Sequence, residues 1–235
     1  MHRADLGAID IPVPGYVIQS GDGTNILIDT GFPYEAMKNP QPFAPPGVRV
    51  EMREEDFIVN RLATIGLRPE DIDILVCTHF DTDHAGNHDL FPNAEPVVQR
   101  GHYEFARRIE LERFANVRER WDHLALRYRF VDGDAELIPG VELIETSGHV
   151  PGHQAVLVRL PETGTVILAI DAIPHSSMLD AETRWVMPID MDERGTREST
   201  RKLVELARRE NAAFIVHGHD SEQWKTLKHA PEFYS

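Results

Sequence analysis

The chain has 235 residues, of which 41% are hydrophobic and 27% are charged, and its formal net charge at pH 7 is -15. This length can bury one large core or two small ones. The negative charge disfavours nucleic acid and anionic membrane surfaces as partners, and no apolar run approaches the ~20 residues of a membrane span. We therefore expect a soluble globular protein whose partner is a neutral or apolar small molecule.

Two further features concern the cellular compartment. Residues 1–15 lack the apolar stretch of a signal peptide. Cys77 is the single cysteine of the chain, which excludes an internal disulfide framework. Both features favour a cytoplasmic location.

Strand-like and helix-like segments alternate along the chain. The apolar spacing predicts helices over 54–67, about 103–120 and about 197–210. Most of the predicted strands are apolar throughout, which indicates sheets buried on both faces. We expect a single α/β (α+β) domain over residues 1–235, because no feature requires a split into two domains. The predicted strands cover 15–20, 24–31, 74–80, 95–99, 141–149, 155–160, 165–172 and 212–220.

One segment interrupts the alternation. Residues 39–50 read NPQPFAPPGVRV and contain four prolines, too many for the interior of a regular element. We expect a loop here. A long loop in a compact domain is often a lid or a binding loop, although a surface insertion without a role explains it equally well.

The stretch ILVCTHFDTDHAGN, residues 74–87, places four potential metal ligands directly after an apolar strand. His79 and Asp81 lie two positions apart, so their side chains leave the strand on the same side. If the chain turns at Thr82, Asp83 and His84 reach a neighbouring position. The motif therefore contributes to two ion sites but cannot complete either of them alone.

Three other apolar strands also end in potential ligands. They supply His149, Asp171, and the pair His217 and His219. The carboxyl ends of strands are where α/β folds commonly place their sites. A single His or Asp at the end of a strand is explained by local structure alone. The recurrence of such endings on several strands of one chain predicts a metal site. A two-residue spacing points His217 and His219 in the same direction, so periodicity does not choose between them.

These motifs resemble the metallo-β-lactamase superfamily and, within it, the N-acyl homoserine lactonases. The resemblance covers nearly the whole chain. It extends over residues 28–37, 54–75, 78–87, 96–106, 138–156, 166–172 and 214–224. It implies a four-layer αβ/βα sandwich with two divalent metal ions, zinc or alternatively manganese, iron or cobalt, held between two sheets.

The resemblance also assigns the ligands. His79, Asp81 and His149 are expected to hold the first ion, and Asp83, His84 and His219 the second. Asp171 is expected to bridge both ions. Asp29 matches an acid that steadies the metal-binding loops, whereas His153 is expected to support its loop without binding metal.

The chain departs from the family at residue 81, where the usual run His-x-His-x-Asp-His has Asp81 in place of the second His. An aspartate oxygen can still bind zinc, manganese or iron. With a hydroxide and three aspartates facing two divalent ions, the formal charge of the core is zero, whereas a His would leave it at plus one. We expect a less acidic bridging water and a preference for metals harder than zinc. The alternative is that Asp81 points away and the first site is empty or weak.

A second departure concerns the lactonases themselves. They carry a Tyr three residues after the bridging Asp, a position that Pro174 occupies here. His175 follows and is expected either to supply the missing hydrogen bond as a catalytic residue or to be a surface histidine. Aromatic residues and methionines in predicted loops are candidates for an acyl pocket or for core and dimer contacts. They are Phe32, Tyr34, Phe43, Met178, Trp185 and Met187.

The favoured function is that of a dinuclear-metal hydrolase that opens a lactone ring, with N-acyl homoserine lactones as substrates. The expected reaction is attack by a metal-bridging hydroxide. Asp171 positions the metal pair, and either Asp83 or a nearby acid carries a proton to the leaving alkoxide. One alternative keeps the same core but acts on another lactone, an ester or a phosphoester. Another is a metal-stabilised scaffold without catalysis. A homodimer is plausible from the resemblance alone.

Overall fold

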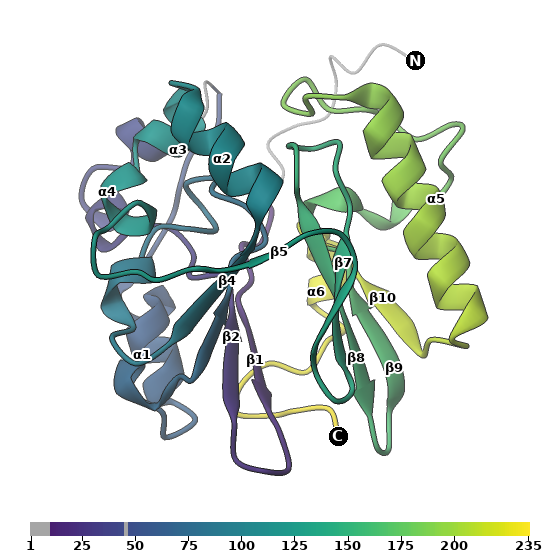
Figure 1. Cartoon of the computed structure of the whole chain (residues 1–235), viewed down its shortest axis with the longest axis horizontal. Coiled ribbons are helices and arrows are strands. Elements are labelled where there is room, and N and C mark those ends of the chain that lie inside the picture. Colours follow the sequence, from purple (N-terminus) through teal and green to yellow (C-terminus); the bar gives the residue numbers. More distant parts are fainter. Residues whose placement is uncertain (1–9, 45–46) are drawn as a thin grey trace.

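The computed structural model describes residues 10–44 and 47–235, which form two five-stranded sheets packed face to face (Figure 1). Helices α1 to α4 cover the outer face of one sheet, and α5 covers the outer face of the other (Figure 1). These four layers confirm the predicted αβ/βα sandwich. The helices are α1 (Ile58–Ala63), α2 (Arg100–Arg108), α3 (Glu112–Ala115), α4 (Arg118–Trp121), α5 (Glu193–Arg209) and α6 (Ser221–Trp224).

The first sheet has the order β1-β2-β3-β4-β5, in which only β1 is antiparallel to its neighbour. The second sheet has the order β10-β9-β8-β7-β6, in which only β10 pairs in parallel. The strands of the first sheet are β1 (Tyr16–Gln19), β2 (Asn25–Ile28), β3 (Ile74–Val76), β4 (Glu95–Gln99) and β5 (Arg129–Val131). Those of the second are β6 (Ala135–Ile138), β7 (Val141–Glu145), β8 (Gln154–Leu160), β9 (Gly164–Leu168) and β10 (Phe214–Val216).

The apolar strands are explained by burial on both faces. On β2, Ile26 and Ile28 point into the core between the sheets, while Leu27 points to the layer that contains α1. On β8, Val156 faces the other sheet and Leu157 faces α5. Because side chains alternate along a strand, a strand covered on both sides needs apolar residues at every position.

The helix predicted over 103–120 is wrong in its continuity. The chain forms α2, α3 and α4 in its place, and Ile109 and Leu111 between the first two have extended backbone angles. These breaks let Phe114 and Trp121 pack into one cluster with Phe80. Tertiary packing therefore overrides the helical propensity of this segment.

Other boundaries also differ from the predictions. Only α1 is α-helical within the range 54–67, after a 3-10 turn over Glu54–Asp56. Strands β5 and β6 were missed because they are short and mix polar with apolar residues. Across residues 10–44 and 47–235, no helix is long and apolar enough to cross a membrane.

Candidate metal centre

The polar residues predicted to follow the strands meet between the two sheets. They come from different strands, and each lies a few residues beyond the end of its strand or at the start of the next turn. All of these side chains are buried or nearly buried. They are Asp29 after β2, His79 after β3, His149 after β7, Asp171 after β9 and His219 after β10.

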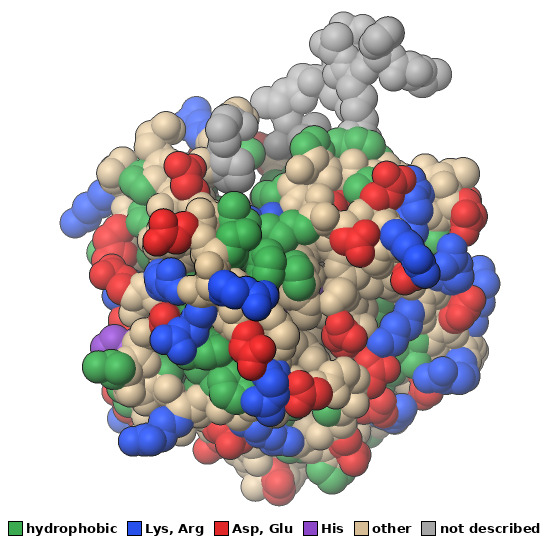
Figure 2. Space-filling model, turned by 45° about the horizontal axis from the view of Figure 1, so that its top comes forward, with side chains coloured by type: hydrophobic (Ala, Val, Ile, Leu, Met, Phe, Trp, Pro, Cys, Tyr) green, Lys and Arg blue, Asp and Glu red, His purple; other side chains and the backbone are tan. Residues whose placement is uncertain are grey.

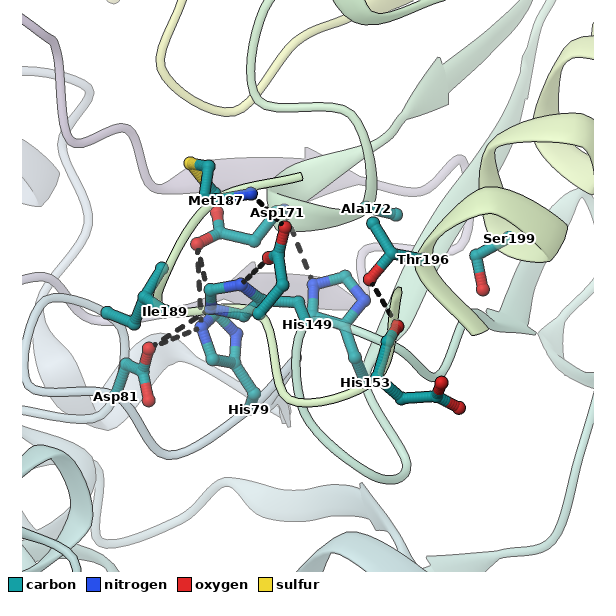
Figure 3. Close-up of polar contacts among 12 residues, drawn as sticks. His79, Asp81, His149, His153, Asp171, Ala172, Met187, Ile189, Thr196 and Ser199 are labelled. Atoms are coloured by element: carbon teal, nitrogen blue, oxygen red, sulfur yellow. Dashed lines mark hydrogen bonds and ion pairs between the residues drawn. The ribbon is translucent and has the colours of Figure 1, made fainter. Parts of the chain in front are cut away.

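The first group consists of His79, Asp81, His149 and Asp171, whose ligand atoms all lie within 4.8 Å of one another. Their side chains turn toward a common point (Figure 3). Oδ2 of Asp81 lies 3.4 Å from Nε2 of His79 and 3.2 Å from Nε2 of His149. Asp81 therefore points into the cluster, as its predicted role as a ligand requires.

The second group consists of Asp83, His84 and His219, again within 4.8 Å of one another. Oδ1 of Asp171 lies 3.6 Å from Nε2 of His84 and 3.0 Å from Nε2 of His219. Its other oxygen, Oδ2, lies 3.3 Å from Nε2 of His149 in the first group. Asp171 thus presents one carboxylate oxygen to each group.

In each of the four histidines of the two groups, Nδ1 points away from the cluster and contacts another part of the protein. Nδ1 of His84 lies 2.8 Å from Asp29, and Nδ1 of His219 lies 2.8 Å from the carbonyl of Pro12. Nδ1 of His149 contacts Asp190, and Nδ1 of His79 lies 3.0 Å from Oγ1 of Thr78. With a proton on Nδ1, each ring directs the lone pair of Nε2 into the cluster, the arrangement expected of metal-binding histidines.

Several atoms at the centre are buried and have no hydrogen-bond partner among the described residues. They are Nε2 of His79, Nε2 of His84 and Oδ1 of Asp171. Oδ1 of Asp171 lies 3.0 Å from Nε2 of His219, but with the ring proton on Nδ1 both atoms are acceptors and form no hydrogen bond. Buried polar atoms are normally satisfied. Three unsatisfied atoms that converge on one region, with the carboxyl groups of Asp81 and Asp83 beside them, fit divalent cations.

The electrostatics favour ionised carboxylates in the centre. Burial alone would raise the pKa of Asp81, but the nearby His79 and Arg113 hold it well below its usual range. Burial likewise opposes ionisation of Asp171, yet the surrounding imidazoles, led by His219, keep its pKa well below the usual value. Both side chains are therefore available as anionic ligands at neutral pH.

Asp29 connects the loops that carry the ligands. Its carboxylate accepts hydrogen bonds from the backbone N–H and the hydroxyl of Thr78, at 2.9 and 2.7 Å, and contacts His84. Its backbone is held at φ 57°, a conformation that non-glycine residues rarely adopt. The position of Asp29 agrees with the supporting role predicted for it.

His153 lies beneath the centre and does not join either group. Its Nδ1 lies 2.8 Å from the hydroxyl of Thr146, and the backbone N–H of Asp171 donates to its Nε2 at 3.3 Å. Burial lowers its pKa well below the usual value, so the imidazole is neutral and can accept this bond. It supports the turn that carries Asp171.

The structure separates the two histidines that follow β10. His219 joins the second group, whereas His217 joins neither, and its buried Nδ1 has no hydrogen-bond partner in the described part of the chain. Gly218 makes this possible, because a Cβ at that position would lie 2.5 Å from the carbonyl oxygen of Ile170. Strand β10 ends at Val216, so the next residues do not continue as a regular strand, on which both rings would point the same way.

The position of His175 does not support its predicted catalytic role. Its Nδ1 accepts a hydrogen bond from the backbone N–H of Ser177 at 3.1 Å, and its Nε2 lies 3.6 Å from Oδ1 of Asp220. His175 is not among the described residues that line the cavity above the centre. The imidazole caps the 3-10 turn Ser176–Met178 instead of facing the two ligand groups.

The centre opens into a cavity of about 2270 Å³ that runs between the two halves of the molecule. Asp81, Asp83 and Asp171 lie on its wall. Hydrophobic side chains gather near the middle of the face drawn in Figure 2, beside the groove between the halves. Of the predicted pocket residues, Phe32, Phe43, Trp185 and Met187 line the cavity; Tyr34 does not, and Met178 packs under α5.

The proline-rich segment borders this cavity. Phe43 and Val48 line it, and the carbonyl of Phe43 accepts a hydrogen bond from the hydroxyl of Thr82 at 2.8 Å. Pro45 and Pro46 lie outside the described residues. The expectation of a loop is confirmed for the residues on either side of them, where only Gln41–Phe43 form a 3-10 turn. The contact with Thr82 favours a binding loop over an insertion without a role.

Two residues of the centre were missed by the sequence analysis. Oδ1 of Asp190 lies 2.8 Å from Nδ1 of His149, and Arg113 forms an ion pair with Asp81. Both are distant in sequence from the groups that they contact. They lie in segments without a ligand motif, so no signal in the chain points to them.

Replacing Asp190 with Asn tests its contact with His149. The amide can present its NH₂ group to Nδ1, which favours the wrong tautomer and withdraws the lone pair of Nε2 from the cluster. We expect the affinity for the first metal ion to fall about 10- to 100-fold. Titration of the metal-depleted protein against a chromophoric chelator measures this change, and Asp180→Asn in an exposed turn is the control. Unchanged affinity in Asp190→Asn would contradict the assignment.

Comparison with known proteins agrees with this geometry. The family model described as the Metallo-beta-lactamase superfamily matches residues 9–219. An N-acyl homoserine lactonase from a Bacillus species is 34% identical over 96% of this chain and 88% of its own length. The N-acyl homoserine lactonase AttM of Azorhizobium caulinodans is 32% identical over 100% of this chain and 91% of its own length.

Solved structures give the same result. The structure of an N-acyl homoserine lactone hydrolase with the product N-hexanoyl-L-homoserine at its catalytic metal centre matches with a TM-score of 0.83 and 33% identity, covering 95% of this chain and 87% of that one. A Bacillus thuringiensis AiiA mutant with N-decanoyl-L-homoserine at its active site matches with the same score and coverage. Sequence, fold and the arrangement of ligands therefore agree that this chain belongs to the metallo-beta-lactamase superfamily.

Proposed function

We propose that this protein is a metal-dependent hydrolase that opens the ring of N-acyl homoserine lactones. The observation that carries the proposal is the carboxylate of Asp171, which presents one oxygen to each of two ligand groups on the wall of a partly apolar cavity. The similarity to lactonases over nearly the whole chain supports the choice of reaction.

Two divalent ions belong to the proposal, either zinc or, as alternatives, manganese, iron or cobalt. We assign His79, Asp81 and His149 to the first ion. We assign Asp83, His84 and His219 to the second, with Asp171 shared by both. Metal ions bound in this way lower the pKa of water and polarise a carbonyl oxygen.

The side chains of this chain do the remaining work. Asp171 fixes the spacing between the two groups. Asp83 is partly exposed and lines the cavity, so it can carry a proton to the alkoxide that leaves as the ring opens. The apolar wall, which includes Phe32, Trp185 and Met187, is suited to an acyl chain.

A pH-stat assay with a short and a long N-acyl homoserine lactone tests the proposal, because ring opening releases an acid. We expect rapid acid release from both substrates and none after metal depletion. Failure to open either lactone by a protein that holds both ions would refute the choice of substrate but not the metal centre.

One observation favours a second substrate class. Pro174 stands where related lactonases are expected to carry a Tyr that contacts the opening ring. A hydrolase of another lactone, an ester or a small phosphotriester with the same metal core is therefore the alternative. Higher kcat/KM for such a substrate than for both acyl homoserine lactones would favour it.

His175→Ala decides whether the histidine after Pro174 takes part in the reaction. Because the imidazole contacts Ser177 and Asp220 outside the cavity lining, we expect kcat/KM to stay within about threefold of the wild-type value, a change of less than about 1 kcal/mol. A loss of a hundredfold or more in kcat with KM unchanged would restore the role predicted from the sequence.

A further inference from the structure

Arg113, which lies on α3, contacts the first ligand group at the wall of the cavity. Its Nε donates to Oδ1 of Asp81 at 2.7 Å, and its Nη2 donates to Oδ2 of the same carboxylate. Nη1 donates to the carbonyl of Ile189 at 2.7 Å. The guanidinium side chain is only 14% exposed, so it is fixed by a two-pronged bond to a buried carboxylate.

The same guanidinium touches a second ligand of the first site. Nη2 lies 2.7 Å from Nε2 of His149, the nitrogen that faces the cluster. Nη2 carries only donor hydrogens, so this contact is a hydrogen bond when Nε2 of His149 presents its lone pair, as it does with the ring proton on Nδ1 facing Asp190. Arg113 therefore contacts, with one nitrogen, two of the atoms that we assign to the first metal ion.

The net charge of Asp81 and Arg113 together matters because residue 81 is the position at which the chain departs from its family. A His there would be a neutral ligand, whereas Asp81 adds a negative charge. Arg113 adds a positive charge within hydrogen-bond distance of it. The carboxylate and the guanidinium together carry no net charge, as an imidazole would.

We propose that Asp81 and Arg113 act as one unit, a neutral replacement for a histidine ligand at the first metal site. The inference rests on the proposed metal centre. With Arg113 counted, the formal charge of the core returns from zero to plus one. Arg113 is thus a charge partner of Asp81, and the expected preference for metals harder than zinc is weakened.

The pairing makes the two positions interdependent. If Asp81 becomes His while Arg113 remains, a buried guanidinium loses its carboxylate and faces a divalent cation, which is strongly unfavourable. If Arg113 loses its charge while Asp81 remains, the site becomes more negative and loses a tethered cation that contacts two of its ligands. The first change should weaken binding of the first ion, and the second should strengthen it.

A double-mutant cycle tests this interdependence without any lactone. Wild type, Arg113→Met, Asp81→His and the double variant are depleted of metal and titrated with cobalt(II) against a chelator. The visible absorption of cobalt reports its ligand geometry. We expect two equivalents in the wild type, and a first-site affinity in Arg113→Met that is tighter by on the order of tenfold or more. We expect about one equivalent in Asp81→His and a return to two in the double variant.

Two further variants serve as controls. Arg113→Lys keeps the charge and should keep an affinity close to that of the wild type. Arg107→Met removes an exposed arginine that pairs with Asp122 and should change nothing. If Asp81→His does not fold, the first-site affinities of Arg113→Met and Arg113→Lys still test the inference. A charge effect makes Arg113→Met bind the first ion more tightly than Arg113→Lys.

Either of two results would overturn the inference. One is that Asp81→His alone binds two ions as tightly as the double variant. The other is that Arg113→Met binds the first ion more weakly than the wild type, since Arg113 would then act only by orienting Asp81. Absence of metal binding in every variant would instead refute the metal centre, and two ions without lactone turnover would refute only the substrate.

Discussion

Asp171→Asn is expected to lower kcat/KM by about a thousandfold or more, because the shared ligand accounts for several kcal/mol of the stabilisation that the metal pair gives to the reaction. The amide retains one oxygen, so it cannot present an anionic oxygen to both groups as Asp171 does. We also expect fewer than two equivalents of bound metal. Steady-state kinetics and elemental analysis on the same preparation measure both effects.

The matched control for this variant is Asp132→Asn. Asp132 is exposed, forms an ion pair with Arg100 and does not line the cavity, so its replacement should leave kinetics and metal content unchanged. An Asp171→Asn protein that keeps two equivalents and retains kcat/KM within tenfold of the wild type would show that Asp171 is not shared.

Gly148→Ala is expected to destabilise the protein by about 3 kcal/mol or more, because the added methyl group has no space. The backbone of Gly148 has φ 142°, and a Cβ would lie 2.2 Å from the backbone nitrogen of Thr196. Since α5 would have to move, and His149 with it, the metal affinity should fall as well. Thermal unfolding should show a midpoint lower by roughly 6 to 12 °C for a chain of this length.

Gly101→Ala provides the opposite control. Gly101 lies in α2, and a Cβ there would meet nothing within 4 Å. Alanine should stabilise the helix by up to about 1 kcal/mol. If Gly148→Ala unfolded at the same temperature as the wild type, the close approach of α5 to the loop before His149 would be incorrect.

The strands and the polar residues that meet between the sheets could be predicted because the same physical pattern reveals both. A strand covered on two faces is apolar throughout, so a His or Asp at its end, such as His79 or Asp171, stands out from what precedes it. Strands that end on one edge of a sheet bring these residues together. The family resemblance then selected His219 over His217, a choice that periodicity left open.

The remaining features depend on tertiary contacts that leave no periodic signal. The segment 103–120 has helical composition, but the packing of Phe114 and Trp121 breaks it into short helices. One of these helices carries Arg113 to Asp81, a contact 32 residues apart in the chain. Asp190 reaches His149 from a loop without regular structure. Such residues were found only when the structure placed them beside the ligands.

Two metal ions held by one cluster are expected to open the lactone ring. Titration of the metal-depleted protein with zinc, while ring opening of an N-acyl homoserine lactone is followed in a pH-stat, tests this expectation. We predict that activity rises with added zinc and reaches its plateau at two equivalents per chain. A plateau at one equivalent, or ring opening without any metal, would contradict a reaction that depends on both ions.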